Sequence, residues 1–497
     1  MTFDVHQLDL FLLVGAGVTL LAILAVRVSS RAGLPSLLLY LLMGVALGEN
    51  FIGINFENAE LAHALGFAAL ALILAEGGLT TSWAEVRPSM RLGVSLATLG
   101  VGVSVAIVAV GAHFLLGLSW ELSVLLGAVT SPTDAAAVFS VLRGLPLSPR
   151  LVGALEAESG LNDAPTVVLV TLISTGAVAD HGIAVTVLVI VFELLGGVLV
   201  GLVVGFGGAW LMRRAALPSS GLYPLAVVCL TLLAYGASAT VHASGFAAIY
   251  IAALVLGNSE LPHRTATRSF AEGVAWLAQI GLFVMLGLLL TPSRITWSMV
   301  GIAVVGSLLL TFVARPITVW VSAIVQPMPW REIAFVSWAG LRGAVPIVLA
   351  TIPFAEGVTN AERLFDIVFV IVVISTVLTG PTLPMVAGWL GVTRQLEPRS
   401  LDLEVAPLER LSADMLQVTI SPVSRLHGVE VGELRLPEGS SVSMVVRDGR
   451  AIVPERRTVL RRGDDLLVVT PRGLREPTVR RLRTVSAHGR LGRWLGD

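Results

Sequence analysis

Residues 127–138 read GAVTSPTDAAAV and place a proline among small polar residues inside an otherwise apolar stretch. Proline removes a backbone donor and clashes with the preceding turn, so a helix is interrupted near Pro132. Small polar side chains can satisfy the freed backbone groups where no water is at hand. We therefore predict a broken helix around this proline.

A second stretch of the same kind lies about two hundred residues further along the chain. Residues 338–350 read WAGLRGAVPIVLA, in which Gly340, Gly343 and Pro346 surround a single arginine, Arg342. Paired interruptions in matching positions of two halves indicate an inverted-repeat transporter whose site lies near the middle of the membrane. The alternative is that the two prolines only kink packing helices, and the matched pair of breaks disfavours it.

The composition places the chain in the membrane class. Of its 497 residues, 55% are hydrophobic and only 13% are charged, with a mean hydropathy of +0.85, whereas soluble domains are about 25% charged. The net charge of −1 suggests no nucleic-acid partner. A single cysteine, Cys229, excludes a disulfide framework and a cysteine-based metal site, and we expect no cofactor. The first apolar stretch reads as a membrane helix, not as a cleaved signal.

Apolar stretches follow one another as far as residue 392, each long enough to cross a bilayer at roughly 20 residues per span. The predicted fold class is thus an all-α polytopic membrane protein with about thirteen helices in two inverted repeats. Six helices on either side of the seventh place each break in the fifth helix of its half. The predicted spans are residues 8–27, 34–50, 60–79, 91–113, 121–142, 150–178, 183–212, 219–239, 242–258, 268–290, 297–325, 331–354 and 363–390.

Arginines gather in alternate loops, and the loops between them carry acidic residues and little arginine. Because positive charge marks cytoplasmic loops, we predict a cell-membrane protein with its N-terminus outside and its C-terminus in the cytoplasm. An odd number of helices requires the same arrangement. The arginines concerned are Arg27, Arg31, Arg87, Arg91, Arg143, Arg150, Arg213, Arg214, Arg264, Arg268 and Arg331.

Beyond Arg394 the composition changes to charged residues alternating with short β-branched runs. We predict a transport domain over residues 1–392, a small cytoplasmic α+β domain with a βαβ-like outline over residues 393–485, and a tail over residues 486–497. In the α+β domain we predict strands at residues 415–420, 441–446 and 464–469. We also predict short helices at residues 427–436 and 474–485, with turns between these elements.

Residues 158–165 read ESGLNDAP and carry two acidic side chains into an apolar setting. Charges there are costly, so a chain that retains them generally uses them. Ser159 and Asp163 are four residues apart and share one helical face, and Glu158 and Asn162 form the neighbouring pair. Asp163, beside a broken helix, offers hard oxygen ligands to a small cation, and we expect it to be functional.

Two other carboxylates of the membrane region, Glu158 and Glu76, also need an explanation. A buried carboxylate needs a partner or a proton, so we expect Glu158 to form a structural pair with Arg342. Glu76, near the cytoplasmic end of the third predicted span, either joins the site or reaches towards the membrane interface.

Three motifs together resemble the monovalent cation:proton antiporters of the sodium/proton exchanger superfamily. They are TSPTD at residues 130–134, ESGLNDAP at 158–165 and WAGLRGAVP at 338–346. The asparagine–aspartate pair is the most specific element. This chain departs from the family pattern in one place, because it has Thr-Asp-Ala at the break where the family commonly has Thr-Asp-Pro.

The resemblance implies roles for individual residues. Asp163 would bind cation and proton in turn, with Ser159, Thr133 and Glu76 as further ligands of the monovalent cation. Supporting residues would be Asn162, which orients the core, Asp134 at the first break, and Glu158 as the partner of Arg342.

Residues 421–469 resemble a TrkA-type C-terminal regulatory domain. This implies a small regulatory ligand and, by association, exchange of potassium in preference to sodium. We expect an electroneutral, alternating-access antiporter that forms a homodimer in membrane lipid, with a sodium/proton antiporter as the alternative.

Two unrelated classes of protein, an ion channel and an intramembrane protease, are the alternatives, and the sequence lacks the motif of each. A channel would require a TVGYG-type filter, which the sequence lacks. An intramembrane protease is suggested only weakly by Ser159 and His242, and the sequence has no HExxH motif. We therefore predict a transporter and not an enzyme.

Overall fold

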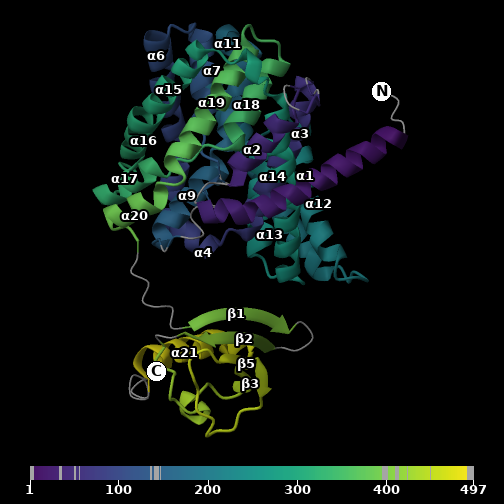
Figure 1. The fold of residues 1–497 in the computed structure, drawn as a ribbon, viewed down its shortest axis with the longest axis vertical. Coiled ribbons are helices and arrows are strands. Elements are labelled where there is room, and N and C mark those ends of the chain that lie inside the picture. Colours follow the sequence, from purple (N-terminus) through teal and green to yellow (C-terminus); the bar gives the residue numbers. More distant parts are fainter. Residues whose placement is uncertain are drawn as a thin grey trace. The chain divides into compact units, whose positions relative to one another are not determined.

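The computed structural model divides the chain into two compact units, Met1–Thr393 and Arg394–Asp497. It describes residues 5–32, 36–49, 52–54, 56, 58–134, 137–138, 145, 147–393, 401–408, 413–421, 424–447 and 449–489. The first unit is helical, and the second holds a small sheet and one helix (Figure 1). The predicted fold class is thereby confirmed.

Every predicted span contains helix among the described residues, although residues 34, 35 and 50 of the second span and residues 135, 136 and 139–142 of the fifth span lie outside them. The helices of the first unit are α1 (Val5–Ala32), α2 (Ser36–Leu47), α3 (Ala59–Thr80), α4 (Trp83–Val86), η1 (Arg87–Ser89), α5 (Met90–Ser95), η2 (Leu96–Gly100), α6 (Val101–Leu116), α7 (Trp120–Thr130), α9 (Pro149–Leu161), α10 (Asp163–Ser174), α11 (Ala177–Arg214), α12 (Leu222–Thr240), α13 (Gly245–Asn258), α14 (Arg264–Leu289), η3 (Pro292–Arg294), α15 (Trp297–Leu309), η4 (Leu310–Ala314), α16 (Arg315–Ser322), α17 (Trp330–Trp338), α18 (Ala344–Ala355), α19 (Ala361–Thr379) and α20 (Leu383–Leu390).

Six continuous helical stretches among the described residues are long and apolar enough to cross a membrane unaided. A seventh is possible if α19 and α20, which meet at a 46° bend, count as one span. The remaining apolar helices among the described residues have 10–17 residues, and α7 and α18 beside the two breaks are among them. The number of thirteen crossings therefore stays a prediction.

Helix-to-helix contacts divide most helices of the first unit into two groups. In one group, α14 packs against α2 and α3, and α13 packs against α3, α11 and α12. In the other, α7 packs against α6, and α19 packs against α15 and α18. The two groups meet where α18 contacts α3 and where α10 contacts α11 and α13.

Glycine permits the closest helix contact in the first group. A Cβ on Gly44 of α2 would overlap the backbone of Val284 and Gly287 on α14, and a Cβ on Gly287 would in turn overlap Leu41. Small residues let membrane helices approach in this way, since packing drives their association.

On the outside of the group, the single cysteine Cys229 is exposed on α12.

Both predicted interruptions are present. α7 ends at Thr130, and residues 131–134 are not helical. α17 ends at Trp338, and α18 begins only at Ala344. Pro346 lies in the first turn of α18, where a missing N–H is tolerated, so the second break falls before this proline.

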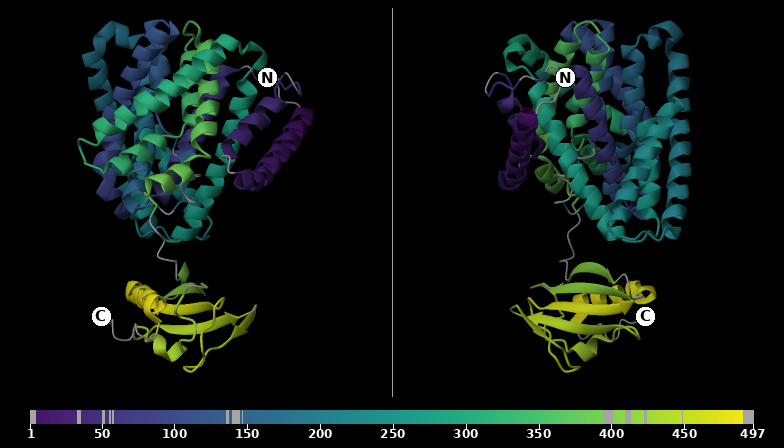
Figure 2. Two further views of the ribbon diagram at one scale, coloured as in Figure 1. Left: turned by 60° about the vertical axis from the view of Figure 1, so that its left-hand side comes forward. Right: turned by 90° about the vertical axis from the view of Figure 1, so that its right-hand side faces the viewer.

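The second unit is a five-stranded sheet in the order β1-β2-β5-β3-β4, with α21 (Arg475–His488) beside it (Figure 2). Leu482 and Val485 of α21 share a buried cluster with Leu416 and Val468 of the sheet. The strands are β1 (Leu401–Leu408), β2 (Ala413–Ile420), β3 (Ser441–Arg447), β4 (Arg450–Ile452) and β5 (Asp465–Pro471).

Two expectations for this unit are wrong. All strand pairs among the described residues of this unit are antiparallel. The βαβ-like outline therefore does not apply, because it requires a parallel pair joined by a longer crossover. Of the short helix predicted over residues 427–436, only the 3₁₀ turn Val431–Leu434 forms, since Gly428 adopts a positive φ of 84°. Residues 490–497 of the predicted tail lie outside the described residues.

Candidate functional site

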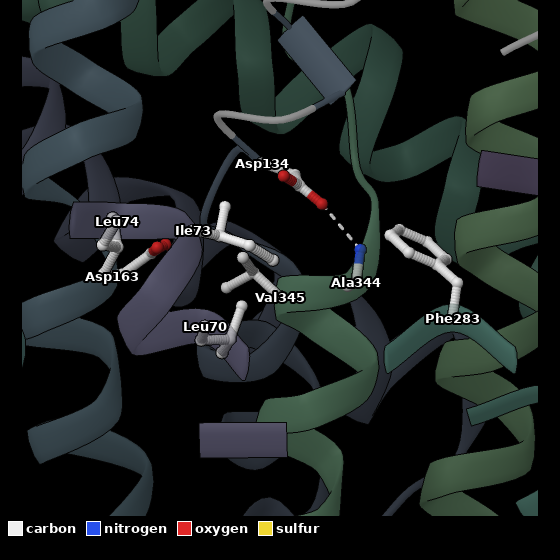
Figure 3. A pocket seen from close by; sticks show the side chains of 8 residues that line it. All are labelled: Leu70, Ile73, Leu74, Asp134, Asp163, Phe283, Ala344 and Val345. Atoms are coloured by element: carbon white, nitrogen blue, oxygen red, sulfur yellow. Dashed lines mark hydrogen bonds between the residues drawn. The ribbon is translucent and has the colours of Figure 1, made fainter. Parts of the chain in front are cut away.

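The two broken helices cross next to each other in the first unit. The backbone N–H of Asp134 donates to the carbonyl oxygen of Leu341 (3.0 Å), which joins the two non-helical segments directly. The Asp134 carboxylate accepts a hydrogen bond from the backbone N–H of Ala344 (2.6 Å), as Figure 3 shows. A Cβ on Gly343 would overlap this carboxylate, so glycine is needed at the crossing.

Charged side chains compensate the helix ends at this crossing. Asp134 lies at the N-terminus of α18, where the helix dipole favours negative charge. Arg342 Nε donates to the carbonyl oxygen of Thr130 at the end of α7 (2.9 Å), and Arg342 Nη1 donates to that of Gly340 just beyond α17. Helix C-termini favour positive charge, so each broken helix has a partner of the right sign.

The asparagine–aspartate motif lies against the first break. α9 and α10 meet at Asn162, whose backbone remains close to helical (φ −78°, ψ −22°). Asn162 Nδ2 donates to the hydroxyl of Thr133 (2.8 Å) and, at 3.3 Å, to its carbonyl oxygen. The motif thereby fixes the position of Thr133, and the supporting role of Asn162 stays a prediction.

Asp163 lines a cavity of about 10 Å³, room for one occupant the size of a water molecule. Asp134 lines it from the other side, and the remaining lining residues are apolar apart from the backbone of Ala344: Leu70, Ile73, Leu74, Phe283 and Val345 (Figure 3). Asp163 is only 2% exposed, and no described residue donates a hydrogen bond to its Oδ1. A carboxylate so placed needs a proton or a cation.

The other predicted ligands do not line this cavity. The Ser159 hydroxyl is fully buried and donates to the Leu155 carbonyl oxygen within α9 (2.7 Å), which leaves its lone pairs available. Thr133 is next to Asp134 and is 2% exposed. Glu76, on α3, is half-buried and is not among the lining residues.

The predicted pair of Glu158 and Arg342 is wrong. Glu158 instead forms a two-pronged ion pair with Arg315, whose Nη2 donates to Oε2 (2.8 Å) and whose Nη1 donates to Oε1. The physical reason is that Arg342 is held by the carbonyl oxygens at the ends of two helices. Arg315, which we did not predict in this role, stands as a lone charge in the span 297–325, and such a charge signals a buried partner.

Comparison with known proteins gives the class of this molecule. Residues 17–389 match the family described as "Sodium/hydrogen exchanger, transmembrane", and residues 415–476 match the TrkA-C domain. The chain therefore belongs to the sodium/hydrogen exchanger family, as its three motifs indicated. It is a multi-pass membrane transporter and not an enzyme.

Individual relatives of this chain are named for the ions that they exchange. The K(+)/H(+) antiporter NhaP2 of Shewanella sp. (strain ANA-3) is 36% identical over 477 residues, which cover 94% of this chain and 82% of the relative. The K(+)/H(+) antiporter NhaP of Alkalimonas amylolytica is 34% identical over 476 residues, 93% of this chain and 82% of the relative. The Na(+)/H(+) antiporter ApNhaP of Aphanothece halophytica is 28% identical over 418 residues, 78% and 77% of the two chains.

The fold also has a solved counterpart. The sodium proton antiporter MjNhaP1 from Methanocaldococcus jannaschii superimposes with a TM-score of 0.64 over 77% of this chain and 99% of the other, at 22% sequence identity. At that identity the likeness concerns the fold.

Proposed function

We propose that this chain exchanges potassium for protons and that the two ions compete for Asp163. The observation that carries the proposal is the buried Oδ1 of Asp163, which receives no hydrogen bond from the described residues and faces a cavity of ionic size. A bare carboxylate in a low-dielectric site is costly. Either a proton or a monovalent cation removes that cost, so binding of one ion displaces the other.

We propose three further oxygen ligands for the cation, although none of them lines the cavity at Asp163. Thr133 is held in place by Asn162, and Ser159 lies one helical turn before Asp163 on the same face. Glu76 is a further candidate from α3. In this arrangement Asp134 supports the site through the α18 N-terminus, and Glu158 supports it through Arg315.

The two helix groups support a mechanism of alternating access. The group that contains the broken helices carries Asp163, and it moves against the group formed by α2, α3 and α11–α14. This motion takes a buried carboxylate past apolar surface, so it is favourable only when Asp163 is neutralised. When Asp163 is empty and charged, the protein cannot change the side of the membrane to which its site opens. This prevents an uncoupled leak of ions.

Potassium is the proposed cation because the relatives at 34–36% identity that cover most of this chain are named K(+)/H(+) antiporters. The TrkA-C domain also favours potassium, by its association with potassium transport. Sodium is the second candidate, supported by the relative at 28% identity that is named a Na(+)/H(+) antiporter.

Everted membrane vesicles that contain this chain provide the test. A pH gradient built by respiration quenches a pH-sensitive dye, and added potassium should restore more fluorescence than sodium, rubidium or lithium does at equal concentration. Vesicles without the chain are the control. If none of the four cations restores fluorescence, the proposed exchange of a monovalent cation for protons is wrong. A larger response to sodium would replace potassium by sodium as the proposed cation.

We expect the exchange to be electroneutral. Glu158 is neutralised by Arg315, and Asp134 is bound to the N-terminus of α18. One titratable carboxylate, Asp163, then carries one proton or one monovalent cation. A membrane potential imposed with an ionophore on proteoliposomes should leave cation uptake unchanged. Potential-driven uptake would require a second titrating group, and Asp134 and Glu76 would be the candidates.

The second unit is the proposed regulatory domain, with boundaries near residues 393 and 485. The arginine-rich loops favour a cytoplasmic position for this domain, in a cell-membrane protein whose N-terminus is outside. A small ligand binding to this domain would tune transport, and a homodimer would bring two such domains together.

Deleting residues 400–497 should leave exchange in place but change its dependence on pH or on small cytoplasmic solutes. The reason is that every proposed site residue lies in the first unit, which is compact without the second. Dye dequenching in everted vesicles, scanned over pH, measures the change. Complete loss of exchange in a truncated chain that still inserts at normal level would contradict a regulatory role.

A further inference from the structure

A second cavity lies in the first unit, between η4, the end of α17 and the second half of α19. Its volume is about 10 Å³, which is again room for one small occupant. It shares no lining residue with the cavity at Asp163. Its polar lining includes Arg315, Arg342 and Ser375, and the exchange mechanism assigns no ligand to it.

Three buried donor atoms at this cavity have no acceptor among the described residues. They are Arg315 Nε, Arg342 Nη2 and Ser375 Oγ. Their residues are 4%, 2% and 3% exposed. A guanidinium group can donate but never accept hydrogen bonds, so an occupant that satisfies these atoms must be an acceptor.

The two guanidinium groups are close neighbours. Both converge on Gly340, where a Cβ would stand 2.6 Å from Arg315 Nε and 2.8 Å from Arg342 Nη1. The absence of a side chain at Gly340 therefore makes the room. Two like charges this close repel strongly away from water. Among the residues that the structure describes, Glu158 is the one carboxylate that forms an ion pair with either arginine.

We propose that this cavity binds a small monovalent anion of the size of chloride. The unsatisfied atoms can donate up to four hydrogen bonds, one from Arg315, two from Arg342 and one from Ser375. A water molecule can accept about two of these. A monatomic anion accepts all of them and also reduces the repulsion between the two arginines. The neighbouring Thr379 hydroxyl donates to the Ser375 carbonyl oxygen (2.6 Å) and so does not compete.

Thermal unfolding of the purified full-length chain tests this site without measuring transport. Chloride is exchanged for gluconate at constant potassium and constant ionic strength. We expect the midpoint of unfolding to rise with chloride and to saturate, since a ligand that binds only the folded state stabilises it. Ser375→Ala should raise the half-saturating chloride concentration roughly tenfold, which corresponds to one hydrogen bond to a charged partner.

Two further variants sharpen the result. Ser375→Asp supplies a carboxylate in place of the anion, so its midpoint should no longer depend on chloride. Ser307→Ala is the matched control, because Ser307 is equally buried but bonds to Ile371 at another place on α19, and it should respond as the native chain does. Bromide added to crystals should give anomalous density between Arg315 and Arg342.

A midpoint that is the same in chloride and gluconate would overturn the proposal. So would an equal chloride response in the native chain and in Ser375→Ala, because the anion would then bind elsewhere. Water density with no bromide signal in the cavity would show that water alone satisfies the arginines. If Ser375→Asp fails to fold, the comparison of Ser375→Ala with Ser307→Ala still decides the question.

Discussion

Asp163→Asn should be well expressed, correctly inserted and inactive at every pH. Asparagine keeps the size of the side chain and part of its hydrogen bonding but cannot carry charge. The cation then loses its counter-charge, and the proton loses its acceptor, so both halves of the cycle fail together. Folding should survive, because a neutral amide is easier to bury than a carboxylate. Cation-dependent proton flux in proteoliposomes, measured across the pH range, is the readout.

Glu193→Gln is the matched control for this experiment. It also replaces a membrane carboxylate by its amide, but Glu193 lies on α11 and does not line the Asp163 cavity. Exchange by the control should match that of the native chain. Robust cation/proton exchange by purified Asp163→Asn protein would remove the centre of the proposed mechanism.

Arg315→Ala should destabilise the first unit by about 3–5 kcal/mol, the usual cost of breaking a buried ion pair. The substitution leaves the carboxylate of Glu158, which is 2% exposed, without its two-pronged partner. Thermal unfolding in detergent and the yield of folded protein are the measurements. The double variant Glu158→Gln with Arg315→Gln should recover most of the loss, because neither side chain is then a lone buried charge.

Arg342→Ala tests whether Glu158 depends on Arg342 as well as on Arg315. It frees two carbonyl oxygens at helix ends but leaves the Glu158–Arg315 pair intact. Adding Glu158→Gln should therefore give no rescue of Arg342→Ala. Rescue of Arg342→Ala by Glu158→Gln, with none for Arg315→Ala, would contradict the pairing seen here.

Features that depend on local sequence were predictable. The apolar spans follow from the length needed to cross a bilayer, and the breaks follow from proline and glycine flanked by polar residues. β2, β3 and β5 were predicted from β-branched runs. β1 was missed because acidic residues and a proline interrupt its apolar residues, and β4 was missed because it has only three residues.

Features that depend on contacts distant in sequence were not predictable. Two arginines could pair with Glu158, and the family resemblance favoured Arg342, whereas packing places Arg315 against it. Asp134 was read as a supporting residue, but nothing local showed that it would bond to Ala344, 210 residues further along the chain. The same crossing brings it into one cavity with Asp163. The roles proposed for Ser159, Thr133 and Glu76 stay predictions.

The exposed position of Cys229 on α12 makes this chain convenient for spectroscopy. It is the only thiol in the sequence, and an exposed substitution such as Cys229→Ser generally changes stability by less than about 0.5 kcal/mol. A thiol-free background is therefore one substitution away. Pairs of cysteines introduced on the two helix groups could then carry fluorophores or spin labels, and the distance between the groups could be followed while potassium and pH are varied.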